Sequence, residues 1–364
     1  MQDMALAQVP SSRAVQPALS PVVIRFGRLG DTVLLQPLLH KLHLRYGRPC
    51  RLLALGGWPP ALYAGQRDVS RVITFRTQHR PLWMSPLRLR AALALRSMRE
   101  APFYICEPEL RTQTKVRPML ALAGIPAEHC VFIENTPLQQ DEHWADWLVR
   151  FAETTPAAFR QTHGQTIASV RAAPQLQASA DERNHCDAWL YARGLNDSPL
   201  VLLQPANKRT MRWNGVRKGA DDDKSWPVSR WAALARAIID RLPGVRVLLC
   251  GAPAEARYLD SIQQAAAHAA VSVAAADLPL GRLRALLEVA HSMVSVDTGP
   301  AHLAAAMGCP LVVLFGARSP SQWAPRSARD SAVSVLGGLP SIHRVDEIET
   351  AQVVDAWHRL PLRR

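Results

Sequence analysis

Two apolar runs near the end of the chain enclose residues whose types could bind a sugar phosphate, in VSVDTGPAHLAAAMGCPLVVLFG (residues 294–316). These residues are Asp297, Thr298, Gly299 and His302. The first run is typical of a buried strand, and Pro300 suits the first turn of a helix, where an N–H is not needed. In one interpretation, Asp297 or Thr298 only caps this helix. In the other, backbone N–H groups at the helix start bind a phosphate, and Asp297 accepts hydrogen bonds from sugar hydroxyls.

A second candidate lies near the start of the chain, in RFGRLGDTVLLQPLLHKL (residues 25–42). The pattern predicts a strand that ends at Phe26, a turn with two glycines, and a helix that begins near Asp31. The spacing G-x-x-G-D differs from G-x-G-x-x-G, so we infer no dinucleotide fingerprint. Asp31 suits a helix N-cap, and the alternative is a general base that faces a cleft.

Two further segments of the second half precede predicted helices. Lys224, in GADDDKSWPVSRW, is a compact cation that suits a diphosphate leaving group, or it belongs to a solvated charged turn. Glu255, in CGAPAEARYLDSI, suits the ribose of a nucleotide, or it only favours the dipole of its helix. A basic segment before Lys224 (206–219) offers further phosphate ligands; its cations are Lys208, Arg209, Arg212, Arg217 and Lys218.

The elements that must position these residues are short apolar runs alternating with helical patterns, which is typical of βαβ units and a parallel sheet. In the first half the runs are 22–27, 51–56, 71–75, 103–106 and 130–134, and in the second half 200–205, 245–251, 292–297, 310–316 and 332–338. Residues 135–199 show no clear strand and predict helices and loops. We therefore expect an α/β protein of two Rossmann-like domains facing each other across a cleft, with ligands beyond the carboxyl ends of the strands.

Composition narrows the class of protein. The chain has 364 residues, 48% of them hydrophobic, which excludes a disordered or fibrous protein. No apolar run approaches the ~18 residues of a membrane span, and the start does not read as a signal peptide. Six scattered cysteines without C-x-x-C predict buried, reduced thiols in a cytoplasmic protein. A net charge of +13 indicates anionic partners, and without zinc spacing or an RNP motif we expect no nucleic acid.

Taken together, these segments resemble glycosyltransferase family 9, the heptosyltransferases of lipopolysaccharide core assembly. The resemblance rests on four motifs in order over roughly residues 21–325: GRLGDTVLLQPLL, DDKSWP, GAPAE and VDTGPAHLAAAMGCPLVVLFGARSP. One place differs, because CEPELRTQTK stands where the family often has an Asp-Leu-Gln-Gly segment followed by Arg-Ser.

The resemblance implies a GT-B architecture. We expect a disordered tail (1–20), an N-terminal acceptor domain with a helical connection (21–190), a C-terminal nucleotide-sugar donor domain (191–345) and a C-terminal helix (346–364).

The resemblance also implies site roles. Asp31 looks like the catalytic base, Lys224 the diphosphate ligand and Glu255 the ribose ligand. Asp297 looks like the sugar-contacting acid, with Thr298 and Gly299 in the phosphate-binding turn and His302 close behind.

The implied reaction is an inverting transfer, with heptose from ADP-heptose as the expected donor and a phosphorylated lipid or lipopolysaccharide core as the acceptor. Protein cations would handle the phosphate charge, so we expect no metal and no cofactor. The alternatives are another nucleotide sugar, a protein acceptor, or a non-catalytic nucleotide-sugar binding protein.

The excess positive charge also suits a peripheral contact with the anionic inner leaflet of the membrane. In SPLRLRAALALRSMR (residues 85–99), helical spacing places Arg88, Arg96 and Arg99 within one arc of about 80°. The alternative is an ordinary solvated helix face.

Overall fold

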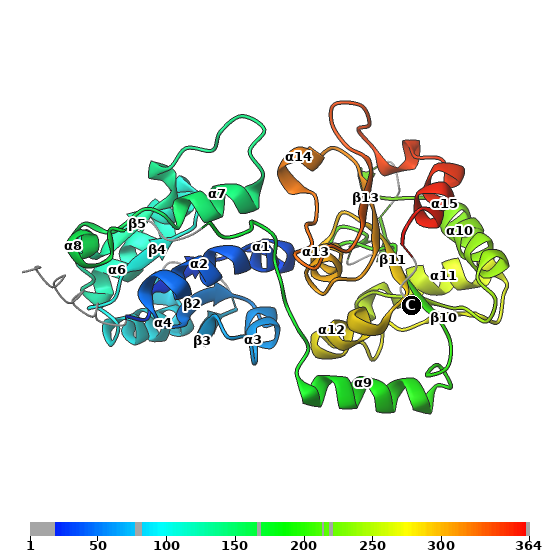
Figure 1. Ribbon diagram of the computed structural model, residues 1–364, viewed down its shortest axis with the longest axis horizontal. Coiled ribbons are helices and arrows are strands. Elements are labelled where there is room, and N and C mark those ends of the chain that lie inside the picture. Colours follow the sequence, from blue (N-terminus) through cyan, green and yellow to red (C-terminus); the bar gives the residue numbers. More distant parts are fainter. Residues whose placement is uncertain (1–18, 77–81, 166–168, 213–214, 218–220, 362–364) are drawn as a thin grey trace, which may run out of the picture.

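The computed structural model describes residues 19–76, 82–165, 169–212, 215–217 and 221–361. Most of the predicted tail (1–20) and the end of the predicted C-terminal segment therefore lie outside the described residues. Two α/β domains lie side by side, each built on a parallel sheet (Figure 1). Each of the ten predicted apolar runs overlaps a strand.

The N-terminal sheet has five parallel strands in the order β3-β2-β1-β4-β5. Their bounds are β1 Val22–Arg25, β2 Cys50–Leu55, β3 Val69–Phe75, β4 Phe103–Ile105 and β5 Cys130–Phe132. Side chains of a strand alternate between the two faces of the sheet, and this divides the core. Val23 packs with α2 (Gln36–Tyr46) and α7 (Trp144–Phe151), while Val22 and Ile24 pack with α4 (Pro86–Arg96) and α6 (Arg117–Ala123).

The first helical stretch is divided in two and starts earlier than predicted. Helix α1 (Leu29–Leu34) begins two residues before Asp31, and Leu35 separates it from α2. The remaining helices of this domain are α3 (Trp58–Tyr63), α5 (Glu109–Arg111) and α8 (Arg160–His163).

The prediction that Arg88 shares an exposed basic arc with Arg96 and Arg99 is wrong. Arg88 is 1% exposed, because helical spacing places it on the core face of α4 with Ala92 and Leu95. Arg96 and Arg99 are exposed.

The C-terminal sheet has six parallel strands in the order β10-β9-β6-β11-β12-β13. Their bounds are β6 Leu200–Gln204, β9 Arg246–Leu249, β10 Val271–Val273, β11 Ser292–Val296, β12 Leu311–Phe315 and β13 Val333–Gly337. The sequence pattern missed β10, which has three residues, and a small antiparallel hairpin, β7 (Met211–Arg212) with β8 (Gly215–Val216). If the six strands are numbered 1 to 6 along the chain, their order across the sheet is 3-2-1-4-5-6, which is the order of a doubly wound Rossmann fold.

Helices cover both faces of this sheet. On one face lie α10 (Val228–Arg241), α11 (Ala256–Ala266) and α15 (Thr350–His358), and on the other α12 (Leu280–Val289) and α13 (Gly299–Ala306). Helix α14 (Pro320–Trp323) follows β12. Helix α13 ends before Gly308, and this glycine has a φ of 75°.

Helix α9 (Ala180–Ala192) packs against α12 of the C-terminal domain, although the sequence assigned residues up to 190 to the N-terminal domain. Arg284 of α12 is fully buried and pairs with Glu182 of α9. The chain therefore crosses between the domains before residue 180, and the predicted boundary falls inside a helix of the second domain.

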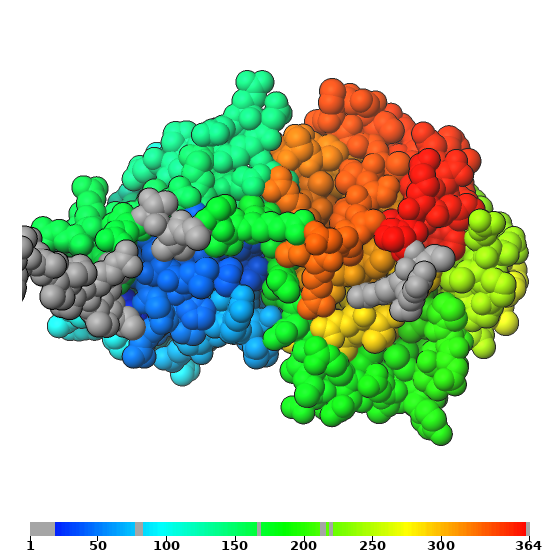
Figure 2. Space-filling model, viewed as in Figure 1, coloured from blue at the N-terminus to red at the C-terminus, as the bar shows by residue number. Residues whose placement is uncertain are grey.

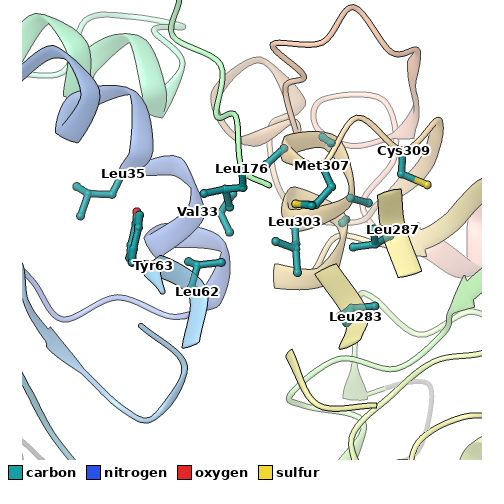
Figure 3. Close-up of a cluster of buried hydrophobic side chains, with 14 of the residues drawn as sticks. Val33, Leu35, Leu62, Tyr63, Leu176, Leu283, Leu287, Leu303, Met307 and Cys309 are labelled. Carbon is teal, nitrogen blue, oxygen red and sulfur yellow. The ribbon is translucent and has the colours of Figure 1, made fainter. Parts of the chain in front are cut away.

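The two domains share a buried apolar cluster. Figure 3 shows Val33 and Leu62 of the N-terminal domain opposite Leu303 of α13 and its C-cap residue Met307, with Leu176 of the crossing segment between them. The space-filling view shows the lobes in contact, with a notch at the top between the α7 side and the α14 side (Figure 2). The junction is thus packed, and the strand ends of both sheets meet around it.

The six cysteines are free thiols, and five of them are buried, in agreement with the prediction. No helix within the described ranges is both long and apolar enough to span a bilayer.

Candidate active site

Two of the predicted site residues, Asp31 and Asp297, follow strands at the switch points of the two sheets, where strand order reverses and ligands bind in open α/β folds. Asp31 follows β1, whose neighbour β4 is followed by Glu107. Asp297 follows β11, which pairs with β6. Helices α1 and α13, which begin after β1 and β11, pack against each other across the domain junction. The folding of each sheet therefore brings Asp31 and Asp297 to the same junction from opposite sides.

Asp31 is held by two donors, and its side chain is 24% exposed. One oxygen accepts the backbone N–H of Arg28 at 2.9 Å, and the other accepts Nη2 of Arg25 at 2.8 Å. Arg28, not Asp31, occupies the N-cap position, so the predicted cap is displaced by one turn. The carboxylate nevertheless satisfies a free N–H at the helix start, so Asp31 has a structural role in addition to any chemistry.

Arg25 was not predicted as a site residue from the sequence, yet it contacts several groups on the N-terminal side of the junction. Its guanidinium donates to the Cys106 carbonyl at 2.7 Å and lies 3.8 Å from the Glu107 carboxylate, which is fully buried. Burial alone would lower the pKa of Arg25, but Asp31 and Glu107 hold that pKa above its usual value. Arg25 therefore stays a cation beside Asp31. A charged residue at the end of an apolar strand is the signal that could have identified it.

Lys224 and Asp297 are in direct contact. The sequence analysis offered Lys224 as a diphosphate ligand and Asp297 as an acceptor for sugar hydroxyls, and these two roles require the residues to be neighbours. Lys224 Nζ donates to the Asp297 carbonyl at 2.8 Å and forms an ion pair with its carboxylate. The side chains are 16% and 10% exposed, respectively. A charge pair this well shielded from water has a stronger electrostatic interaction than one at the surface. The pair joins the loop before α10 to the end of β11.

His302 lies on the first turn of α13, with Nε2 3.9 Å from the Asp297 carboxylate. Burial and the nearby Lys224 lower its pKa, against the opposite effect of Asp297 and Asp31. Its ring is therefore neutral near pH 7, and within the described part of the chain its buried Nδ1 has no hydrogen-bond partner.

The starts of α1 and α13 are in close contact, and two glycines make this possible. A Cβ on Gly299 would lie 2.8 Å from Leu29 Cβ and 3.1 Å from the Gly30 nitrogen. A Cβ on Gly30 would lie 2.9 Å from His302 Cδ2. Thr298 is the N-cap residue of α13, and its hydroxyl lies 3.3 Å from that of Ser295. The helix start at Gly299 thus points its backbone N–H groups and positive dipole end at the junction.

Glu255 lies apart from the other candidate residues. It follows β9, and β6 lies between β9 and β11, the strand that leads to Asp297. Its carboxylate accepts the Ala252 N–H at 2.7 Å and is nearly buried. Burial raises the pKa of Glu255, and the Ala252 hydrogen bond opposes this effect. The structure therefore brings six of the seven predicted residues to the junction, and Glu255 lies after β9 at the carboxyl ends of the strands of the C-terminal sheet.

The basic segment is partly neutralised by acids that follow it. Arg209 pairs with Asp223 at 2.6 Å, and Arg217 donates to the Asp221 carbonyl at 3.0 Å. Lys208 is exposed. Lys218 and the side chain of Arg212 lie outside the described residues.

Two aromatic rings join the domains beside the site. Trp144 of α7 stacks on Trp323 of α14 with ring centroids 4.7 Å apart, and Arg25 lies over Trp144 at 5.2 Å. His143 Nε2 contacts the Ala324 carbonyl at 2.9 Å, and Nδ1 accepts the Ala145 N–H at 3.1 Å, which caps α7. These contacts, which the sequence did not predict, link the N-terminal domain to the segment after β12.

A cavity of about 670 Å³ lies elsewhere, along the edge strand β5 and the segment around Thr155. None of the seven predicted residues lines it. Among the described residues, no group of three or more His, Cys, Asp or Glu side chains is arranged to hold a metal ion.

Comparisons with known proteins agree with this arrangement. Residues 171–351 match the family model described as glycosyltransferase family 9 (heptosyltransferase). Lipopolysaccharide heptosyltransferase 2 of Escherichia coli (strain K12) is 23% identical over 332 residues, covering 88% of this chain and 89% of that protein. Lipopolysaccharide core heptosyltransferase OpsX of Haemophilus influenzae is 30% identical over 163 residues, 44% of this chain and 42% of that protein.

Solved structures share the fold. The E. coli ADP-heptose lipopolysaccharide heptosyltransferase II matches with a TM-score of 0.69 at 20% identity, over 93% of this chain and 98% of that one. A family 9 glycosyltransferase from Veillonella parvula matches with a TM-score of 0.73 at 17% identity, over 94% and 97%. The architecture is therefore GT-B, as predicted.

Proposed function

The chain belongs to glycosyltransferase family 9, and we propose that it transfers a heptose from ADP-heptose to the core of a lipopolysaccharide acceptor, with inversion at the anomeric carbon. Two considerations support this choice of donor and acceptor. The relatives carry the name lipopolysaccharide heptosyltransferase, and one structural neighbour is a heptosyltransferase with a fluorinated ADP-heptose. The observation that carries the proposal is the meeting of Asp31 with the Lys224–Asp297 pair at the start of α13.

Asp31 is the proposed general base. Its carboxylate would take the proton from an acceptor hydroxyl while that oxygen attacks the anomeric carbon. The hydrogen bonds from Arg25 and the Arg28 amide fix its orientation, so the acceptor meets a positioned carboxylate. Arg25 is itself held by the Cys106 carbonyl, which limits how far the carboxylate moves.

Lys224 and the start of α13 are the proposed ligands of the diphosphate. Negative charge grows on this leaving group as the sugar departs, and a fixed cation with a helix dipole stabilises it. Lys224 would turn from Asp297 to the phosphates, and this would free the Asp297 carboxylate for sugar hydroxyls. Thr298 and Gly299 would form the phosphate-binding turn, with neutral His302 behind it.

Glu255 is the proposed ribose ligand, at the far end of an extended donor. Its carboxylate oxygens are acceptors, which suits the two hydroxyls of a ribose. No metal is needed in this scheme, because protein groups supply the positive charge. We place the reaction in the cytoplasm, at the inner leaflet.

The test is transfer by the purified protein with ADP-heptose, UDP-glucose and GDP-mannose as competing donors and a heptose-deficient core acceptor. We expect ADP release and product with ADP-heptose, and a product anomer opposite to that of the donor by NMR. EDTA should leave the rate nearly unchanged. A preference for UDP-glucose or GDP-mannose would overturn the proposed donor. Retention of the anomeric configuration would overturn the inverting mechanism. A loss of activity in EDTA that Mg²⁺ restores would overturn the metal-free scheme.

A further inference from the structure

Large apolar side chains are exposed at one end of the N-terminal domain. Trp83 is 76% exposed, Met84 45%, Leu87 44% and Leu110 79%. Single exposed apolar residues are ordinary, but a group of them marks an interaction site. Trp83 and Met84 lie in a short 3₁₀ turn (Leu82–Met84) that packs on α4, which carries Leu87.

These residues lie at the end of the domain that faces the active site. Helix α4 runs back from the carboxyl ends of the strands to the start of β4, so its first residues lie at the edge where β1 leads into Asp31. Helix α5, with Leu110, follows β4 at the same edge, and its Arg111 donates to the Phe26 carbonyl at 3.2 Å. The Arg88 guanidinium donates to the Lys115 carbonyl at 3.3 Å and thereby joins α4 to the turn after α5.

The segment that carries α4 has charges of one sign, whereas α5 carries the exposed acid Glu109 beside Leu110. Residues 69–99 contain seven arginines and no aspartate or glutamate. Arg90 and Arg96 are exposed on α4, and within the described residues no carboxylate pairs with them. Arg90 lies between Leu87 and Leu93, which is 57% exposed, on the solvent face of the helix. Apolar and cationic side chains are thus interleaved on one surface.

We propose that this surface, formed by Trp83, Met84, Leu87, Arg90, Leu93 and Arg96, docks on an anionic lipid bilayer. Tryptophan and leucine enter the interface between headgroups and acyl chains, while arginine binds lipid phosphates. The inference rests on the proposed function, because a lipid-anchored acceptor must reach Asp31 from a membrane. Docking at this edge would bring the bilayer to the acceptor side of the junction and leave the donor domain free.

The first test is cosedimentation of the full chain with phosphatidylcholine vesicles, with and without phosphatidylglycerol. We expect binding only to the anionic vesicles. The double variant Trp83→Gln with Leu87→Gln should bind about tenfold more weakly, and so should Arg90→Gln with Arg96→Gln. The matched control is Tyr191→Gln with Val289→Gln, two residues of the C-terminal domain that are 77% and 54% exposed, and it should bind as the wild type does.

Equal binding by the test and control variants would overturn the proposal, as would equal binding of the wild type to neutral vesicles. If the wild type binds no vesicles but is a dimer that the Trp83/Leu87 variant dissociates, the surface joins two copies of the chain and the proposal is wrong. Circular dichroism of each variant checks that it is folded.

The second test separates this inference from the proposed function. The Trp83/Leu87 variant should glycosylate a water-soluble, delipidated core acceptor at the wild-type rate, and an acceptor embedded in anionic vesicles more slowly. Equal rates on the embedded acceptor would contradict docking. If the wild type transfers to neither acceptor, the proposed function fails, while vesicle binding still decides whether the surface docks on membranes.

Discussion

At the scale of single residues, the site consists of two ion pairs. In each pair the opposite charge of the partner compensates for the burial of the charged group. Asp31 pairs with Arg25, and Lys224 pairs with Asp297. A buried charge that loses its partner is costly, so these pairs stabilise the fold and hold in place the groups to which we assign the chemistry. Asp31 and Asp297 were predicted from the sequence because each follows an apolar run, and the structure brings both to the junction. Arg25 and Glu107 were missed, because local sequence does not show which charged strand-end residues face each other across a sheet.

Removing the Lys224 ammonium should weaken handling of the donor. Charge-assisted hydrogen bonds contribute ~1.5–3 kcal/mol, so Lys224→Ala should lower kcat/KM for the donor roughly ten- to a hundredfold. Asp297 would be left nearly buried without its partner, so the Tm should fall as well. The control is Lys208→Ala, an exposed lysine of the basic segment. Normal kinetics in a folded Lys224→Ala protein would show that other cations bind the diphosphate.

At the scale of elements, the sequence was most informative where strands are long and apolar. The period of the pattern identified the strands of both sheets except β10, which is too short to show a period, and the β7–β8 hairpin, whose residues read as a basic loop. The start of α1 was misplaced because Asp31 has the composition of an N-cap but bonds back to the Arg28 amide. The contact of α1 with α13 joins elements more than 250 residues apart, and no local pattern encodes it.

The close approach of these two helices predicts that Gly299→Ala impairs the enzyme. The new Cβ would lie 2.8 Å from Leu29 Cβ, so α1 and α13 would have to separate. Overpacking of this kind costs about 1–3 kcal/mol, and it would also shift Asp31 relative to the Lys224–Asp297 pair. Transfer rate and Tm should both fall. Gly57→Ala is the control, because nothing lies within 4 Å of a Cβ there. An unchanged transfer rate in Gly299→Ala would show that the helix contact does not matter for catalysis.

At the scale of the whole molecule, two facing domains were predicted correctly, but the contacts that join them were not. The Trp144–Trp323 stack and the His143–Ala324 hydrogen bond connect segments about 180 residues apart, and their residues read as ordinary loop and helix positions in the sequence. Helix α9 spans the boundary predicted at residue 190; it follows a stretch without strands, and its packing on α12 is not visible in the local sequence.

The His143 contact predicts that acid weakens the junction. Burial and then Arg326 lower the pKa of His143 to about 4, from an ordinary value of 6.5. The folded protein therefore favours neutral His143, and the free energy of unfolding should fall as the pH drops from 6.5 towards 4, where the unfolded chain binds the proton first. The contribution of this residue is of the order of 3 kcal/mol.

Urea unfolding of the wild type and His143→Gln at several pH values measures this effect. The glutamine keeps a donor for the Ala324 carbonyl but does not titrate, so its stability should fall less steeply between pH 6.5 and 4. His358→Gln, at an exposed position of α15, should follow the wild type. Parallel curves for the wild type and His143→Gln would show that His143 does not carry the acid sensitivity.

The central claim is that Asp31 accepts the acceptor proton, and Asp31→Asn tests it most directly. The amide oxygen can still accept from Arg25 or the Arg28 amide, and Glu107 still lies 3.8 Å from the Arg25 guanidinium. The protein should therefore stay folded with a lower Tm, but the side chain no longer takes a proton. General-base catalysis accounts for about 10²–10⁴ in rate, so transfer should fall by that factor while donor affinity, measured by calorimetry, stays near that of the wild type. Asp355→Asn, an exposed carboxylate of α15, is the matched control. A folded Asp31→Asn protein that transfers heptose at the wild-type rate would contradict the account and make Asp297 the next candidate for the base.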